Sequence, residues 1–204
     1  MVSLRKPVAT KHSLYSSVVI DDLRSRCPNV ACLYADYKDQ NNQTLGNILG
    51  TFLRQFLATA QTPIPDEVTK RLHDIQREGG KAGLQDNLVL LKTQLHHLKY
   101  AFICIDAVDE LDSDVRWKLL KELKDLGTKN MRLFLTGREH VASEVQKQLQ
   151  VLEGNKVIIS ATPQDIEEFV SHKIQEDRER DSVAMDDILE KAIVGTIIEK
   201  SQGM

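Results

Sequence analysis

Glycine is scarce in this 204-residue chain, and none precedes Gly46. Cysteine is also sparse: Cys27, Cys32 and Cys104 form an odd set without metal-ligand spacing, which favours a reducing compartment and argues against a disulfide framework. No apolar run approaches the ~18 residues needed to span a bilayer, and Met1–His12 lacks the apolar core of a secretory signal. With a net charge of -3, the chain has no basic footprint for nucleic acid or membrane. We therefore expect a cytoplasmic protein.

The composition is that of an ordinary globular protein. The hydrophobic fraction of 41% and the charged fraction of 28% are typical of such proteins. At about 150 residues per domain, the length predicts one domain with an appendage. The sequence is therefore long enough to bury a substantial core.

The chain is organised around Tyr100–Leu111, an apolar run that ends in acidic residues. Ala101–Ile105 is too short for a helix and is typical of a strand buried on both faces of a parallel sheet. Asp106, Asp109 and Glu110 follow it. Because ligands of open α/β sheets bind beyond the carboxyl ends of the strands, these carboxylates are candidate functional groups. The simpler interpretation is a strand followed by a solvated acidic turn.

Hydrophobic periodicity predicts strands that alternate with helices along most of the chain. This alternation favours an α/β fold with a parallel sheet and helices on both faces. We expect residues 1–12 to be irregular, residues 13–178 to form the core, and residues 179–204 to form a C-terminal helical segment. The four predicted strands are centred near Cys32, Ile103, Leu133 and Ile158.

Seven segments, taken in order, resemble a known family. In chain order they are SSVVIDDL (16–23), CLYADY (32–37), TLGNILGTFLRQF (44–56), FICIDAVDEL (102–111), LFLTGR (133–138), TPQDIEEF (162–169) and IEKSQGM (198–204). Together they resemble the NACHT-type nucleotide-binding module of fungal STAND NTPases, in the group with a nephrocystin-3-like N-terminal domain. The resemblance covers Ser13–Met204 and implies a three-layer, P-loop NTPase-like α/β fold.

The resemblance also implies roles for particular residues. Asp106 matches the Walker B acid that coordinates Mg²⁺, and Ser13 matches the hydroxyl that shares this metal. Asp109 and Glu110 match the acids that orient water for attack on a γ-phosphate. Arg138 matches the residue that senses phosphate after the next strand. These residues would form a switch controlled by ATP or GTP.

The phosphate-binding loop departs from the family pattern. A P-loop needs Gly-x-x-x-x-Gly-Lys-Ser/Thr, because backbone N–H groups must wrap the phosphates. The matching stretch, Lys6–Ser13, has Lys11 in place of the last glycine and His12 in place of the lysine. Residue 11 carries a Cβ and does not freely adopt the positive φ of glycine. Nor does Met1–Thr10 predict a regular strand, so we expect the first central strand to be missing or distorted.

The sequence therefore leaves two main functional hypotheses. The first is a NACHT-like signalling switch that binds ATP or GTP with Mg²⁺, with binding impaired by this degenerate Walker A segment. The alternative is an inactive protein-interaction module, or a non-functional fragment of a larger repeat-containing STAND protein. We expect truncation at both ends, with protein partners bound through a missing C-terminal repeat region. An unrelated α/β domain that binds metal without nucleotide is a more distant third hypothesis.

Overall fold

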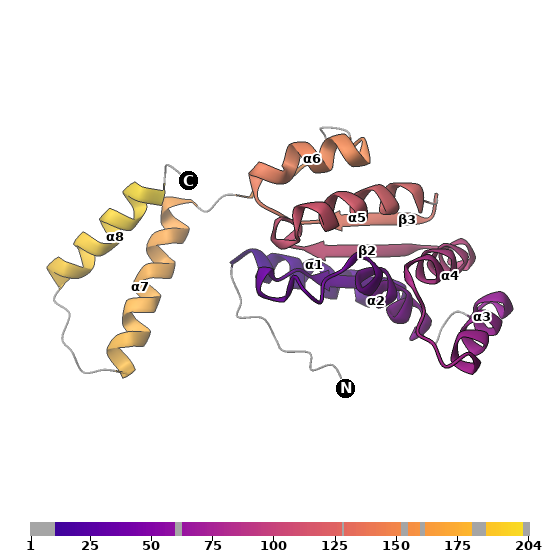
Figure 1. Ribbon diagram of the computed structural model, residues 1–204. Coiled ribbons are helices and arrows are strands. Elements are labelled where there is room, and N and C mark those ends of the chain that lie inside the picture. The colour runs from indigo at the N-terminus through magenta and orange to yellow at the C-terminus, as the bar shows by residue number, and fades with distance from the viewer. Residues whose placement is uncertain are drawn as a thin grey trace. The chain divides into compact units, whose positions relative to one another are not determined.

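The structure is a computed structural model that describes residues 11–59, 63–127, 129–151, 155–159, 162–180 and 187–201 (Figure 1). The chain divides into two compact units, Met1–Leu152 and Glu153–Met204. The boundary expected between residues 178 and 179 falls within α7 (Pro163–Arg180), whereas the observed division puts α7 in the second unit with α8 (Asp187–Ser201). The candidate site residues lie in the first unit.

A three-stranded parallel sheet forms the centre of the first unit. Its order is β1 (Val30–Tyr34), β2 (Ala101–Asp106) and β3 (Met131–Leu135). As the middle strand, β2 is paired on both edges, and Ile103 and Ile105 are fully buried. The predicted central strand is therefore confirmed, as is the α/β class with a parallel sheet.

Helices pack against both faces of this sheet because alternate residues of β2 point in opposite directions. Ala101, Ile103 and Ile105 join the larger apolar cluster, with side chains from the helices that follow β1. Phe102 and Cys104 join a smaller cluster with residues of α1. The helices of this unit are α1 (Lys11–Arg26), α2 (Leu45–Leu57), α3 (Asp66–Arg77), α4 (Leu84–His97), α5 (Ser113–Asp125) and α6 (Glu139–Leu149). Two short 3₁₀ helices are η1 (Tyr37–Asp39) and η2 (Val108–Glu110).

The strand predicted near Ile158 is not formed in the described residues 155–159, so that prediction is wrong. Val157 and Ile158 are 81% and 70% exposed. An apolar run becomes a buried strand only where a neighbouring strand offers unpaired backbone groups. Among the described residues, no strand pairs with this run. Ser160, and residues 1–10 of the expected irregular N-terminus, lie outside the described ranges, while Lys11 already belongs to α1.

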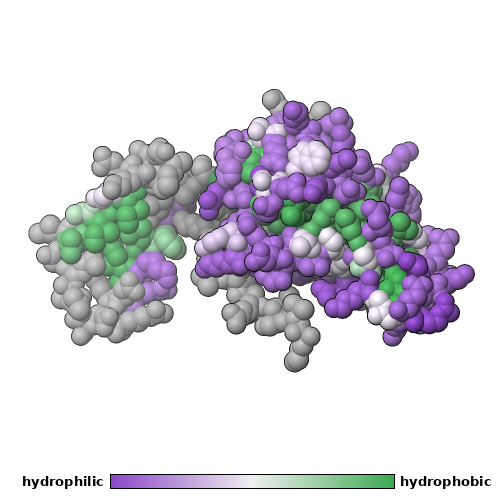
Figure 2. All heavy atoms as spheres, viewed as in Figure 1, coloured by the Kyte–Doolittle hydropathy of each residue, from purple (hydrophilic) through white to green (hydrophobic). Residues whose placement is uncertain are grey.

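The second unit is a pair of helices with a small apolar core. Thr162 and Asp165 form a capping box at the start of α7: the Thr162 backbone N donates to Asp165 Oδ2 at 2.8 Å, and the Asp165 backbone N donates to Thr162 Oγ1 at 3.2 Å. Val170 and Ile174 of α7 pack against Val194 of α8. Figure 2 shows apolar residues gathered between these two helices. No helix within the described ranges is both long and apolar enough to cross a membrane.

Gln94 of α4 is a polar residue in the interior of the first unit, where its burial lowers stability. Its side chain is fully buried, and neither amide atom has a hydrogen-bond partner among the described residues. Because an unsatisfied buried polar group costs about 1–3 kcal/mol, we expect Gln94→Met to raise the free energy of unfolding by about 1 kcal/mol. Urea denaturation measures this change. Gln85→Met, at an exposed position of the same helix, is the control and should change stability by less than about 0.5 kcal/mol. A loss of stability in Gln94→Met would contradict the prediction.

Candidate functional site

Asp106 is the centre of the candidate site. It is the last residue of β2 and is only 3% exposed. Its backbone oxygen accepts a hydrogen bond from the Ala35 backbone N at 3.0 Å, which extends the pairing with β1 to the strand end. The carboxylate thus lies at the carboxyl end of the middle strand, where open α/β sheets bind ligands.

Two hydroxyl groups hold the Asp106 carboxylate. Ser16 Oγ of α1 donates to Asp106 Oδ1 at 2.5 Å, and Thr136 Oγ1, just after β3, donates to the same oxygen at 2.6 Å. The two hydroxyl oxygens are 3.5 Å apart. These bonds join α1, β2 and the end of β3 at one point.

The turn after Asp106 is fixed by the same threonine. Ala107 adopts the left-handed conformation, with φ 55° and ψ 51°, and its backbone N donates to Thr136 Oγ1 at 3.0 Å. The Val108 backbone N then donates to the Thr136 backbone oxygen at 2.8 Å. Thr136 therefore connects the two loops at this edge of the sheet and directs the chain into η2.

Asp109 and Arg138 lie together at the same edge. Arg138 donates its backbone N to Asp109 Oδ1 at 3.2 Å, and its Nε lies 3.5 Å from Asp109 Oδ2. The Asp109 side chain is 6% exposed, whereas that of Arg138 is 72% exposed. The carboxylate therefore holds the loop after β3 and leaves the guanidinium largely in solvent.

Glu110 is directed to a different segment. Its Oε2 accepts a hydrogen bond from the Tyr37 backbone N at 3.4 Å, and its backbone oxygen accepts one from Gln40 Nε2 at 3.0 Å. Glu110 thus connects η2 to the loop after β1. Of the residues expected from the sequence, Asp106 ends β2, and Asp109, Glu110 and Arg138 follow the strands at the same carboxyl edge of the sheet.

The structure describes only the backbone of the predicted Walker A residues Lys11, His12 and Ser13. The backbone of Lys11, His12 and Ser13 forms the start of α1, but their side chains lie outside the described part of the structure. The serine that contacts Asp106 is Ser16, one helical turn after Ser13. Sequence reasoning missed both Ser16 and Thr136 as site residues, although each occurs in a segment that supported the family resemblance.

The Asp106 carboxylate has no positively charged partner among the side chains that the structure describes. Among the described Lys, Arg and His side chains, none lies within ion-pair distance of it. A buried carboxylate without a cation is costly unless hydrogen bonds compensate, and here two hydroxyls do so. The described residues contain no group of three or more His, Cys, Asp or Glu that could hold a metal by themselves. A cation at Asp106 would therefore need ligands from hydroxyls, water or a bound anion.

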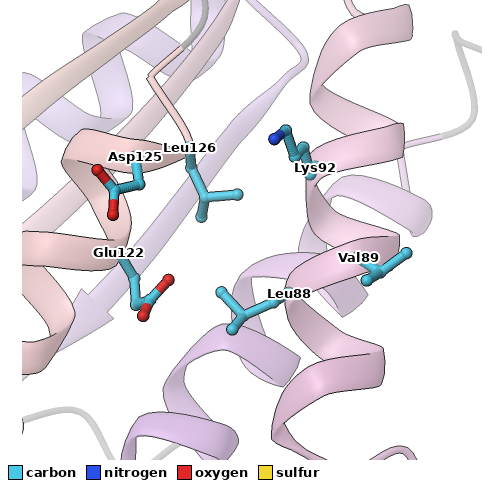
Figure 3. Close-up of a pocket in the computed structure, with 6 residues that line it drawn as sticks. All are labelled: Leu88, Val89, Lys92, Glu122, Asp125 and Leu126. Atoms are coloured by element: carbon cyan, nitrogen blue, oxygen red, sulfur yellow. The ribbon is translucent and has the colours of Figure 1, made fainter.

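A shallow groove lies elsewhere on the first unit, between α4 and α5 (Figure 3). Leu88, Val89 and Lys92 line one side, and Glu122, Asp125 and Leu126 line the other. Its volume of about 140 Å³ is below the ~300 Å³ of a typical small-molecule pocket. Because Asp125 ends α5, the groove lies at the opposite end of that helix from the acidic turn. The groove is therefore separate from the candidate site.

The fold and the site together define the class of protein. It is a mixed α/β unit with a parallel three-stranded sheet and a carboxylate at the carboxyl edge of that sheet. Comparison with protein families adds a specific relationship. The family model described as "Nephrocystin 3, N-terminal" matches residues 6–138, which is more than half of the chain, so the chain belongs to this family. Comparisons with curated proteins and with solved structures found no match.

The Ser16–Asp106 hydrogen bond can be measured by a double-mutant cycle. A hydrogen bond to a charged group contributes about 1.5–3 kcal/mol, and one between neutral groups about 0.5–1.5 kcal/mol. We therefore expect Ser16→Ala to cost more stability in the wild-type chain than in an Asp106→Asn background. Urea denaturation of the four proteins at neutral pH gives the coupling energy. Equal costs in the two backgrounds would show that the hydroxyl does not act on a carboxylate.

Gly137 allows the close packing of the loop that carries Arg138. A Cβ built on Gly137 would lie 2.9 Å from Val108 Cγ1 and 3.2 Å from Val141 Cγ2. We expect Gly137→Ala to destabilise the first unit by about 1–3 kcal/mol, because these buried side chains must shift. Gly46→Ala is the matched control, since a Cβ there has no contact closer than 4.0 Å. Similar denaturation midpoints for the two variants would contradict this packing.

Proposed function

We propose that the chain is a NACHT-like module of P-loop NTPase type whose nucleotide binding is impaired. In this proposal, Asp106 is the Walker B acid, and the phosphate cradle before α1 is degenerate. The nephrocystin 3 N-terminal family match and the parallel sheet support this proposal. The observation that carries it is the buried Asp106 carboxylate at the end of β2, which accepts hydrogen bonds from two hydroxyls and has no cation beside it among the described side chains.

The donor set at Asp106 fits Mg²⁺ bound together with a phosphate. Mg²⁺ prefers six oxygen ligands, keeps several waters, and in nucleotide sites takes only one or two carboxylates from the protein. Asp106 would supply the carboxylate, and Ser16 or the family-matched Ser13 would supply a hydroxyl. When bound, the metal would neutralise the charge on the phosphate oxygens.

Loss of the phosphate-binding loop would lower the affinity for nucleotide more than it would change the preference of the site for Mg²⁺. In a P-loop, glycine backbone and a lysine surround the phosphates at a helix N-terminus. Here α1 begins at Lys11, and the residues that match the loop contain no glycine. Without these donors, the phosphates lose most of their contacts, and we expect any nucleotide complex to be weak.

The other acids have distinct proposed roles. Asp109 holds the Arg138 loop in the described geometry, so it would orient water only after its contact with Arg138 opens. Glu110 lies against the loop after β1 and is the second candidate for that role. Arg138 is 72% exposed and would sense phosphate from the end of β3. In a signalling switch, these contacts would differ between the nucleotide-bound and nucleotide-free states.

Titration with Mg-ATP and Mg-GTP tests the proposed function. We expect weak binding to the wild-type chain, with half-saturation at about 1 mM or above, corresponding to roughly 4 kcal/mol or less of binding free energy. Binding should disappear when EDTA removes Mg²⁺ and in Asp106→Asn, because the carboxylate is the proposed metal ligand. Chemical-shift changes of the backbone amides measure this interaction.

Asp125→Asn is the matched control for Asp106→Asn. Asp125 is an exposed acid at the far end of α5, so its loss should leave nucleotide binding unchanged. Micromolar binding by the wild-type chain would contradict the loss of the cradle. Absence of any Mg²⁺-dependent shift at millimolar nucleotide would refute nucleotide binding itself.

A protein-interaction module is the second candidate, and one observation favours it. Leu189 and Ile197 of α8 are 51% and 39% exposed, and the buried apolar residues among the described side chains of α7 and α8 are Val170, Ile174 and Val194. A helix pair of this size buries little apolar surface by itself. Such side chains are suited to packing against further helices or a protein partner.

A further inference from the structure

All three cysteines of the chain meet in one apolar cluster. Cys104 is fully buried there, and Cys27 and Cys32 pack against it while remaining partly accessible. Cys27 follows α1, Cys32 lies in β1 and Cys104 lies in β2. The sheet has therefore brought together thiols that are far apart in the sequence, on the face covered by α1.

Cys32 and Cys104 are direct partners in the parallel ladder of β1 and β2. Neighbouring strands lie about 4.8 Å apart, and the Cα atoms of disulfide-bonded cysteines are usually about 4.4–6.8 Å apart. Both side chains belong to the smaller cluster, so they project to the same face of the sheet. The register therefore places the two Cα atoms at about the spacing that is usual for a disulfide.

Cys32 has polar neighbours that suit a reactive thiol. Arg24 Nη2 donates to Cys32 Sγ at 2.9 Å, and Cys32 Sγ lies 3.6 Å from Gln55 Oε1. Burial raises the pKa of the Cys32 thiol, and the Arg24 guanidinium offsets part of this rise. Burial, with a contribution from Cys32, raises the pKa of Cys104 to about 11. Cys32 is only partly buried and contacts a guanidinium, so it is more accessible to an oxidant than the fully buried Cys104.

We propose that Cys32 and Cys104 form a reversible disulfide across β1 and β2 when the protein meets a hydroperoxide. The proposal is independent of nucleotide binding, because it uses the face under α1 and none of the Asp106 contacts. The bond would join the two strands two residues before the register pair of Tyr34 and Asp106. It would therefore pin β1 to β2 beside the edge that carries the acidic residues.

The reaction is balanced with the hydroperoxide as the two-electron oxidant. The Cys32 thiolate attacks the outer peroxide oxygen, the O–O bond breaks, and the alcohol or water leaves with a proton, giving a sulfenic acid. The Cys104 sulfur then attacks the Cys32 sulfur, forming the S–S bond. The Cys104 proton and the sulfenic hydroxyl leave together as water. A small thiol reductant returns both cysteines to thiols.

Hydrogen peroxide applied to the folded full chain tests the proposal. Titration of thiols after unfolding should fall from three per chain to one, and dithiothreitol should restore three. Tryptic digestion without reductant should yield peptide 27–38 linked to peptide 100–116, with two hydrogens fewer than the separate peptides. The protein should remain monomeric on a non-reducing gel, because the bond is intramolecular.

Matched variants assign the bond to particular cysteines. The link should persist in Cys27→Ala and disappear in Cys32→Ala, with circular dichroism of the reduced proteins confirming that both fold. A link lost in Cys27→Ala would show that Cys27 is the partner and would overturn the proposal. Three thiols that persist in the folded wild-type chain would overturn it equally.

The rate of disulfide formation in an Arg24 variant tests the role of Cys32 independently of the cysteine variants. Arg24→Gln removes the cation that stabilises the thiolate, so we expect disulfide formation near pH 8 to slow several-fold. Arg26→Gln is the control, because Arg26 pairs with Asp22 instead and is exposed. Equal rates in the two variants would contradict attack by Cys32.

Discussion

The hydrogen bonds from Ser16 and Thr136 to Asp106 are the constraint on which the acidic edge of the sheet depends. They stabilise a carboxylate that is almost fully buried and that has no positive partner among the described side chains. Removing such a carboxylate from water is costly, and hydrogen bonds to the charged form offset that cost. Because the two donors come from α1 and from the end of β3, the same bonds also fix how these segments meet β2. The turn of Ala107 then follows from its bond to Thr136.

The middle strand and the outer edge of this sheet satisfy their backbone hydrogen bonds in different ways. β2 is paired on both sides and buried on both faces, whereas β1 has one outer edge. At that edge Gln55 of α2 accepts from the Cys32 backbone N at 2.9 Å and donates to the Cys32 backbone oxygen at 2.8 Å. The side-chain amide thus makes the two bonds that a neighbouring strand would make, which protects the edge from pairing with another chain.

Elements with a strong hydrophobic pattern could be predicted from the sequence. The run in β2 was identified by its unbroken apolar pattern, and its burial is observed. The run at Val157–Ile159 has the same local pattern, but a strand also needs a partner, and periodicity contains no information about partners. The ends of helices are harder to locate from sequence: at the start of α5 both Asp112 and Ser113 have N-cap chemistry, and it is Asp112 that accepts from the Asp114 and Val115 backbone N atoms. Both residues have the right chemistry, and only backbone geometry distinguishes them.

The candidate site was predictable in its acids but not in the groups that hold them. Asp106, Asp109 and Glu110 follow directly from a strand that ends in acid, whereas Arg138 was expected only from the family resemblance. Ser16 was missed because the sequence motif identifies Ser13 as the hydroxyl residue. In the structure, Ser16, one helical turn later, contacts the carboxylate. Contacts of this kind depend on how far a helix extends along the sheet, which no short motif encodes.

The arrangement around Asp106 explains how a buried acid is accommodated at this edge of the sheet. In a metal site, part of the electrostatic cost of a buried acid is offset by the cation. Here hydroxyl groups already offset it, so the acidic edge is stable before any ligand binds. A cation that approaches Asp106 Oδ1 must compete with both hydroxyl protons, or must use the carboxylate's other oxygen. The same pair of hydrogen bonds therefore stabilises the buried carboxylate and opposes the binding of a cation to Asp106 Oδ1.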